Sequence, residues 1–255
     1  MPVCDSVFAV IGATRGIGAA TVIQLANDYP DASILFCGRD RKAGDALADK
    51  LGGTVEFVPA DVTDSEQVTD FFTTVAARGE LTGAFNCAGV IGTDTMLRGN
   101  SFHTADPAGF EYVMAVNVFG LAACLRQELA LFTGHGHGGA IVNMASTAGL
   151  RAADSLSVSY TASKHAVVGM TRALAAEYAR HHVRINAVCP GVIDTDILEG
   201  LHEPLLAHLR ARNPAATIGT PAQVAATVAF LLSASASYIS GTTVTIDAGG
   251  LQGAL

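Results

Sequence analysis

Charge is scarce in this sequence, and positive charge is the scarcer sign. The chain has 15 lysines and arginines against 23 aspartates and glutamates, which gives a formal net charge of −8. Because a nucleic-acid groove needs clustered lysine and arginine in excess, nucleic acid is not an expected partner. Charged residues make up only 15% of the chain and hydrophobic residues 50%, which excludes a disordered chain and provides for a large core.

Long hydrophobic runs are also missing from the sequence. No run approaches the roughly 18 apolar residues of a membrane span. The first residues, Met1 to Asp5, lack the charged-then-apolar order of a signal peptide. We therefore predict a cytoplasmic protein with no membrane partner.

Cysteine is rare and scattered. The 5 cysteines are not spaced like a zinc knuckle or a redox pair, which favours reduced and mostly buried thiols. Two histidine pairs, His135/His137 and His181/His182, lack a nearby carboxylate or thiolate to complete a metal site. We interpret both pairs as loop histidines and predict no metal.

Short β-branched runs alternate with amphipathic stretches along the whole chain. This pattern is typical of parallel strands joined by crossover helices. It predicts an α/β fold: a single doubly wound Rossmann-type domain, whose seven-stranded parallel sheet has helices on both faces. The predicted strands are Val7–Ile11, Ser33–Phe36, Thr54–Val58, Ala84–Asn86, Ala140–Ala145, Arg184–Val188 and Thr243–Ile246.

Capping and turn residues mark how the chain is organised. Helix starts are predicted at Thr63-Asp64, Asp106-Pro107 and Thr220-Pro221, where a capping side chain precedes a periodic run. No repeat or linker interrupts the pattern, so residues 1–255 are predicted to form one domain. The least regular stretch, 194–220, is interpreted as a lid over a site.

A glycine-rich loop follows the first predicted strand and leads directly into a helix-forming stretch. Glycines at this place let the backbone turn sharply and approach a pyrophosphate at the positive end of the helix. A tight structural turn is the alternative, because the glycine spacing has one residue more than the commonest dinucleotide fingerprint. The predicted pyrophosphate cradle consists of Gly12, Thr14, Arg15, Gly16, Ile17 and Gly18.

The end of the second predicted strand indicates which dinucleotide is preferred. A carboxylate normally binds the adenosine ribose of NAD at this place, but here the position is Gly38, followed by Arg39. The Arg39 guanidinium suits a 2′-phosphate, and Arg15 offers a second cation. Either arginine is also compatible with a solvated loop. We predict that NADP(H) is favoured over NAD(H).

Two further segments are expected where the cofactor crosses the sheet edge. Asp61 and Val62 follow the third predicted strand and are expected to bind adenine, although a helix-capping aspartate is the alternative. Small residues follow the fourth predicted strand, at Asn86, Ala88 and Gly89. Together these segments would span the cofactor from its adenine to its nicotinamide.

Tyr160 and Lys164 stand one helical turn apart, near the start of a long helix-forming stretch. Their side chains can therefore act on one small site. Carbonyl reduction needs a proton donor, and a phenol with a pKa of about 10 donates poorly at neutral pH. We predict that the Lys164 ammonium, together with an oxidised nicotinamide, lowers the pKa of Tyr160.

Two other polar residues are candidates for the same site. Ser146 ends a buried run and is placed to hydrogen-bond a substrate oxygen, although a serine in a tight turn is the simpler interpretation of this residue alone. Asn117 is a polar residue in an apolar helix, so it needs a hydrogen-bond partner, for which water leading to Lys164 is a candidate.

In their order along the whole chain, these motifs resemble the short-chain dehydrogenase/reductase family. The matching positions are Gly12-x-x-x-Gly16-x-Gly18, Asn86-x-Ala88-Gly89, Asn117, Ser146, Tyr160-x-x-x-Lys164 and Pro190-Gly191. The resemblance implies a catalytic tetrad in which Ser146 orients the substrate oxygen and Tyr160 is the acid/base. Lys164 would bind the cofactor ribose and tune Tyr160, and Asn117 would hold a proton-relay water.

The resemblance also implies how the nicotinamide, the substrate and other copies of the chain are bound. A homotetramer or homodimer would form through the helices that carry Asn117 and Tyr160, which the apolar run Val167–Met170 permits. Pro190, Gly191, Ile193 and Thr195 would hold the nicotinamide. The expected substrate pocket is mostly apolar and consists of Ile91, Gly92, Ser146, Leu150, Val192, Leu198 and Leu201.

Two positions depart from the usual family pattern. Ile11 stands where a threonine is usual, and Cys87 stands where a second asparagine is usual. Both replacements are expected to lose a side-chain hydrogen bond. They affect the bracing of the loop and not the phosphate cradle, which is made by backbone amides.

The predicted activity is hydride transfer between NADP(H) and a ketone or secondary alcohol, as in a carbonyl reductase or ketoreductase. One alternative is an NAD-dependent alcohol dehydrogenase that works toward oxidation. Another is a non-catalytic NADP(H)-binding redox sensor, which the presence of all four tetrad side chains disfavours. The small-molecule carbonyl or alcohol substrate is not identified by the sequence.

Overall fold

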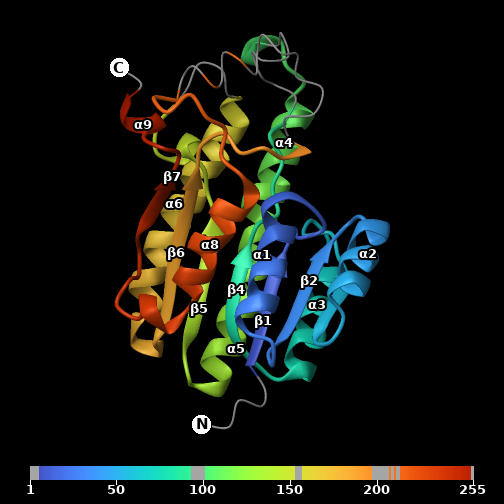
Figure 1. Ribbon diagram of the computed structural model, residues 1–255. Helices are drawn as coiled ribbons and strands as arrows, with labels where there is room; N and C mark the ends of the chain where they lie inside the picture. Colours follow the sequence, from blue (N-terminus) through green and yellow to red (C-terminus); the bar gives the residue numbers. More distant parts are fainter. Residues whose placement is uncertain are drawn as a thin grey trace.

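A computed structural model describes residues 6–92, 101–152, 157–196, 207, 210 and 213–253. Seven parallel strands form one sheet in the order β3-β2-β1-β4-β5-β6-β7, which confirms the predicted doubly wound α/β fold (Figure 1). The strands are β1 (Ser6–Ile11), β2 (Ser33–Gly38), β3 (Val55–Pro59), β4 (Glu80–Asn86), β5 (Gly139–Met144), β6 (Val183–Pro190) and β7 (Thr243–Ile246).

Helices cover both faces of the sheet, because successive side chains of a strand point to opposite faces. In β1, Val7 and Ala9 belong to the core on the side of α3, α5 and α6, whereas Phe8 and Val10 belong to the core on the side of α1 and α8. The helices are α1 (Gly16–Asp28), α2 (Arg41–Leu51), α3 (Ser65–Arg78), α4 (Pro107–Met114), α5 (Leu121–His135), α6 (Val158–Tyr178), α8 (Pro221–Leu232) and α9 (Gly250–Gly253).

The predicted capping residues begin three of these helices. Asp64 accepts from backbone amides at the start of α3, and Asp106 does so at the start of α4. Thr220 forms a reciprocal capping box with Gln223 at the start of α8. Each cap satisfies amides that the helix itself leaves unpaired.

Strand β4 begins at Glu80, four residues earlier than predicted. A charged residue and Gly83 conceal the strand signal, because both residue types are uncommon in strands. In the sheet, Gly83 is needed for packing, since a Cβ there would lie 2.9 Å from the Phe8 ring. The early part of β4 pairs with β1, with Ser6 opposite Glu80.

One helical stretch, Pro107–His135, is long and apolar enough to cross a membrane by length and composition. It is not an unbroken apolar run, since Glu111, Arg126 and Glu128 lie within it. This stretch includes the π-helical segment η3 (Ala115–Gly120), which joins α4 to α5. Leu125 and Phe132 of α5 are buried in the core. Helices in the core of a soluble protein are commonly this long and apolar, so length and composition are weak evidence for a membrane span.

The strand order reverses at β1, whose neighbours are β2 and β4. In sheets of this type the crevice at the carboxyl ends of the strands, next to the reversal, is where ligands bind. The strand arrows in Figure 1 point to this edge, beyond which α4 and α9 lie. Most of the predicted lid, 194–220, falls outside the described residues.

Candidate active site

The glycine-rich loop fits closely against the loop that follows β4. Gly12 has φ +78°, a left-handed conformation, and a Cβ there would lie 2.5 Å from the Cα of Ala88. A Cβ at Gly18 would lie 2.5 Å from the Gly12 carbonyl oxygen. Arg15 precedes α1 without a side-chain cap, so the amides of Gly16 and Ile17 at the start of the helix remain available to an anion. These features fit the pyrophosphate of a dinucleotide.

The replacement of the usual asparagine by Cys87 was expected to lose a side-chain hydrogen bond, but Cys87 has one. The Gly18 amide hydrogen-bonds to the Cys87 sulfur. This bond lowers the pKa of Cys87, but burial has the larger effect and raises that pKa to about 12. The thiol is therefore neutral and ties the loop after β4 to the start of α1.

The end of β2 has no room for the carboxylate that would bind a ribose. A Cβ at Gly38 would lie 2.8 Å from Thr14 Cγ2. Thr14 comes from the glycine-rich loop, so this loop and the end of β2 pack directly on each other. An acidic side chain at position 38 would require Thr14 to move.

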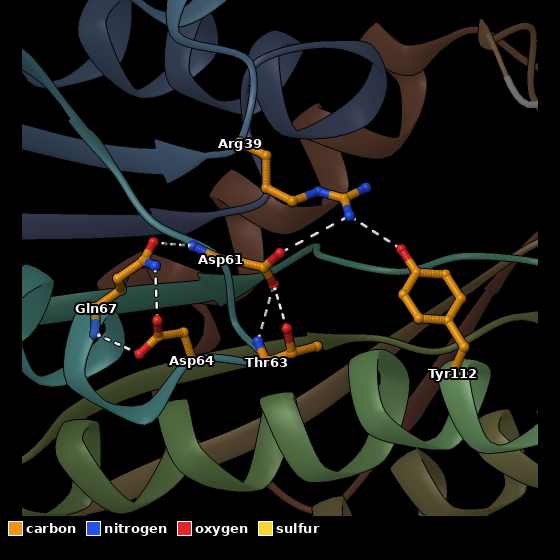
Figure 2. Close-up of polar contacts among 6 residues, drawn as sticks. All are labelled: Arg39, Asp61, Thr63, Asp64, Gln67 and Tyr112. Carbon is orange, nitrogen blue, oxygen red and sulfur yellow. Dashed lines mark hydrogen bonds and ion pairs between the residues drawn. The ribbon is translucent and has the colours of Figure 1, made fainter. Parts of the chain in front are cut away.

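Arg39 lies between two elements that are distant in sequence (Figure 2). Its Nη1 donates to the Tyr112 hydroxyl at 2.9 Å and lies 3.8 Å from Asp61 Oδ2. The Tyr112 hydroxyl raises the pKa of Arg39 further, so the guanidinium stays charged. Tyr112 belongs to α4 and was not predicted, because no local pattern links it to a residue 73 positions away.

The sequence left open whether Asp61 binds adenine or caps a helix. In the structure the cap of α3 is Asp64 and not Asp61 (Figure 2). Asp61 accepts from the backbone amide and hydroxyl of Thr63 at 2.9 and 2.8 Å, and its other oxygen faces Arg39. The Asp61 carboxylate thus closes a turn and also lies beside the expected adenine site.

Arg15 and Gly16 of the glycine-rich loop lie beside Asp196 and Thr195, in the segment after β6. The Arg15 Nη1 lies 3.3 Å from Asp196 Oδ2, an exposed ion pair. A Cβ at Gly16 would lie 3.3 Å from Thr195 Cγ2. The segment expected to hold the nicotinamide therefore lies against the loop expected to hold the pyrophosphate.

Ser146, Tyr160 and Lys164 come together at the carboxyl edge, between β5 and α6. The side chains of Ser146 and Tyr160 are hydrogen-bonded to each other. Lys164 Nζ lies 5.6 Å from the centroid of the Tyr160 ring and donates to the Met144 carbonyl at 2.8 Å. Gly149 lets the turn after Ser146 pack directly on the backbone of α6, since a Cβ there would lie 2.5 Å from the Lys164 carbonyl oxygen.

The lowering of the Tyr160 pKa by Lys164 and an oxidised nicotinamide stays a prediction. Burial raises the pKa of Tyr160, and only the hydrogen bond with Ser146 acts in the opposite direction among its main influences. Burial also lowers the pKa of Lys164, which is 3% exposed, to about 8. Desolvation is therefore the largest influence on the pKa of both groups.

Three hydrogen bonds join the Asn117 side chain to protein groups. Its Oδ1 accepts from the Val90 amide at 2.8 Å, and its Nδ2 donates to the Val90 carbonyl at 2.9 Å and to Ser163 Oγ at 3.0 Å. Both amide hydrogens are used by these partners, and the role of Asn117 in holding a relay water stays a prediction. Asn117 instead joins the loop after β4 to α6, next to Lys164.

The Asn86 side chain points into the core, which its assignment to the cofactor site did not anticipate. Its Nδ2 donates to Glu128 Oε2 at 3.1 Å and to Asn143 Oδ1 at 3.0 Å. Glu128 is 0% exposed, and burial raises its pKa to about 8. The sequence signal for it was an acid on the apolar face of α5, between Leu125 and Phe132.

Glu128 should make stability depend on pH. Between the ordinary carboxyl pKa of about 4.3 and the folded value near 8, the folded chain retains a proton that the unfolded chain has lost. The free energy of unfolding should therefore fall as pH rises, by at most about 1.4 kcal/mol per pH unit. Because Glu128→Gln cannot titrate, its stability relative to wild type should rise between about pH 5 and pH 8 in urea titrations. A constant difference across this range would contradict the assignment.

Part of the expected substrate pocket lies beside this site. The Ile91 carbonyl accepts from Ser157 Oγ at 2.9 Å, and Ser157 caps α6 just before Tyr160. Gly92, Leu150 and Val192 are half-buried. Leu198 and Leu201 lie outside the described residues.

Together, the doubly wound sheet and the glycine-rich turn define a dinucleotide-binding α/β protein with polar side chains at the carboxyl edge. The family model described as "Enoyl-(Acyl carrier protein) reductase" matches residues 12–250. Levodione reductase from Leifsonia aquatica is 34% identical over 257 residues, which cover 96% of this chain and 94% of that protein. A-factor type gamma-butyrolactone 1'-reductase (1S-forming) from Streptomyces virginiae is 35% identical over 254 residues, with 96% and 95% covered.

A solved structure shows the same likeness in three dimensions. The crystal structure of levodione reductase matches with a TM-score of 0.89 at 32% identity and covers 98% of both chains. The chain therefore belongs to the short-chain dehydrogenase/reductase family of nicotinamide-dependent oxidoreductases, and the predicted resemblance is confirmed.

A second polar group lies at the opposite, amino edge of the sheet and corrects one prediction. His137 was expected to lack a carboxylate partner, but its Nδ1 lies 2.8 Å from Glu80 Oε2. The two residues are 57 positions apart, and the early start of β4 brings them together.

Proposed function

We propose that the chain is an NADP(H)-dependent ketoreductase that interconverts a ketone and a secondary alcohol. The observation that carries this proposal is the grouping of Tyr160, Ser146 and the buried Lys164 beside a glycine-rich loop with free helix amides. The two relatives described above are both named reductases, and others, such as cyclohexanol dehydrogenase from Acinetobacter sp., are named for the reverse reaction. Bound NADP(H) would supply the hydride that reaches the carbonyl carbon.

Each residue at the edge has a role that its contacts support. The Ser146 hydroxyl donates to the substrate oxygen, and the Tyr160 hydroxyl gives its proton to the same oxygen. The phenolate left on Tyr160 is stabilised by Lys164, which is largely charged at neutral pH with a pKa of about 8. Asn117 positions the loop after β4 and Ser163 beside this lysine.

The preference for NADP(H) depends on Arg39. Its ion pair with Asp61 favours the alternative, an NAD-dependent dehydrogenase, because a paired guanidinium has less charge to offer a phosphate. At 3.8 Å, with side chains 56% and 30% exposed, this pair is worth about 0–1 kcal/mol. Charge-assisted hydrogen bonds to a 2′-phosphate are worth about 1.5–3 kcal/mol, so the phosphate contact should prevail.

Assembly and cellular place belong to the same proposal: a cytoplasmic homotetramer or homodimer, acting without membrane or nucleic acid. The run Val167–Met170 is a poor basis for assembly, because Val167 and Val168 are 1% and 4% exposed. Phe119 in η3 and Val158 in α6 are better candidates, with 67% and 47% exposed. They lie on the two helical elements expected to meet a second copy.

The proposal is tested by mixing the purified chain with NADPH and a panel of hydrophobic ketones. We expect loss of the reduced-cofactor absorbance with matching formation of alcohol, and a higher kcat/KM with NADPH than with NADH. Cofactor binding without turnover across the panel would instead support a redox sensor. A higher kcat/KM with the NAD(H) pair would support the dehydrogenase alternative.

A further inference from the structure

Three potential metal ligands gather at the amino edge of the sheet, away from the proposed active site. Glu80 begins β4, His135 ends α5, and His137 lies in the loop that leads to β5. Each offers one ligand atom, and these atoms all lie within 4.8 Å of one another. The proposed catalytic groups lie at the other end of these strands, so the two sites are separate.

The loop that carries both histidines is held in place by its glycines. Gly136 and Gly138 have φ angles of +75° and +72°, in the left-handed region that favours glycine. A Cβ at Gly138 would lie 2.4 Å from the His182 carbonyl oxygen. The turn places the rings of His135 and His137 with their centroids 5.6 Å apart.

Two hydrogen bonds hold the His135 ring in one orientation. Its Nε2 lies 3.2 Å from the Leu81 carbonyl oxygen, which can only accept, so Nε2 is the donor. The single lone pair of Nδ1 accepts from the His137 amide at 3.1 Å, so a metal ion bound at Nδ1 would replace this hydrogen bond. Metal-bound histidines typically donate their other ring N–H to such a carbonyl or carboxylate, which fixes the ring and its tautomer. Phe132, with its ring centroid 5.8 Å away, packs edge-on against the same ring.

We propose that Glu80, His135 and His137 bind a divalent transition-metal ion of the zinc type. Two imidazoles and one carboxylate form a known zinc ligand set that leaves a position for water. Zinc bonds of about 2.0–2.2 Å would place tetrahedral ligand atoms roughly 3.4 Å apart. The 2.8 Å contact between Glu80 and His137 would then lengthen by about 0.6 Å, and the widest separation, at most 4.8 Å, would shorten by up to about 1.4 Å. The Glu80 and His137 side chains are 55% and 69% exposed, so they can make these adjustments.

The ion would act as a structural link. It would strengthen the connection between the start of β4 and the loop between α5 and β5, which the contacts of His135 with Leu81 and of His137 with Glu80 already join. Because it would bind the folded chain, zinc should raise the thermal unfolding midpoint. The proposal does not depend on the proposed activity, since no ligand belongs to the catalytic edge.

Titration calorimetry of the full-length protein with Zn²⁺ tests the proposal. We expect one ion per chain at this site and a raised unfolding midpoint. His137→Gln and Glu80→Gln should each weaken affinity at least about 10-fold, because even the loss of an outer-shell partner costs 10- to 100-fold. His165→Gln is the matched control, since this exposed histidine on α6 bonds only to the helix, at the Thr161 carbonyl, and lies outside the cluster. Unchanged zinc affinity in both cluster variants, or no binding of zinc to wild type beyond that of Mg²⁺, would overturn the proposal.

Discussion

Replacing Tyr160 with phenylalanine is expected to lower kcat about 1,000-fold while NADPH affinity stays within about 3-fold of wild type. The expected size follows from general acid–base catalysis, which contributes about 10²–10⁴-fold. Phenylalanine keeps the ring beside Lys164 but removes the proton donor and the hydrogen bond with Ser146. Steady-state kinetics with an active ketone and fluorescence titration of NADPH measure the two quantities.

Tyr178→Phe provides the control for this change. Tyr178 ends the same helix, α6, but lies 18 residues from Tyr160, or about 27 Å along a helix axis. The control should keep kcat near the wild-type value. Wild-type turnover in Tyr160→Phe would contradict the mechanism, and loss of NADPH binding would show that the variant reports on the cofactor site instead.

Replacing Arg39 with alanine should reverse or erase the preference for NADPH. We expect the KM for NADPH to rise about 10- to 100-fold, which corresponds to losing about 1.5–3 kcal/mol of charge-assisted hydrogen bonding. The KM for NADH should change little, because NADH has no 2′-phosphate. Arg41→Ala, which removes an exposed arginine at the start of α2, is the matched control.

Tyr112 tests whether Arg39 acts from the position in Figure 2. Tyr112→Phe removes only the hydroxyl that accepts from Arg39 at 2.9 Å. The expected rise in the KM for NADPH is smaller, about 2- to 10-fold, and should vanish when Arg39 is already alanine. An intact NADPH preference in Arg39→Ala would defeat the assignment of this cofactor.

The parts of the fold that were predicted correctly depend on local signals. Alternating hydrophobicity located the strands, and side chains such as Asp64 and Thr220 marked helix starts, because a cap acts within a few residues. The start of β4 was missed because no local signal marks it. Its pairing with β1 and the packing of Gly83 under Phe8 depend on a strand far away in the sequence.

In the candidate site, too, contacts between neighbours in the sequence were predicted and contacts between distant residues were not. The spacing of Tyr160 and Lys164 fixes their contact within one helix turn. By contrast, the partner of Arg39 is 73 residues away, and Asn86 meets Glu128 across 42 residues. These contacts depend on how helices pack on the sheet, so residue types and spacing could not reveal them. Burial, a tertiary property, raises the pKa of Tyr160, and residue spacing could not reveal this influence.

The most direct test of the account follows a labelled hydride from cofactor to product. Wild type and Tyr160→Phe are incubated with an active ketone and NADPH carrying deuterium at the transferring position, and the alcohol is analysed by mass spectrometry. Wild type should place one deuterium on the carbinol carbon, and the variant should yield at least about 100-fold less labelled alcohol in the same time. Equal yields from both proteins, or alcohol without the label, would contradict proton donation by Tyr160 or hydride transfer from the nicotinamide, respectively.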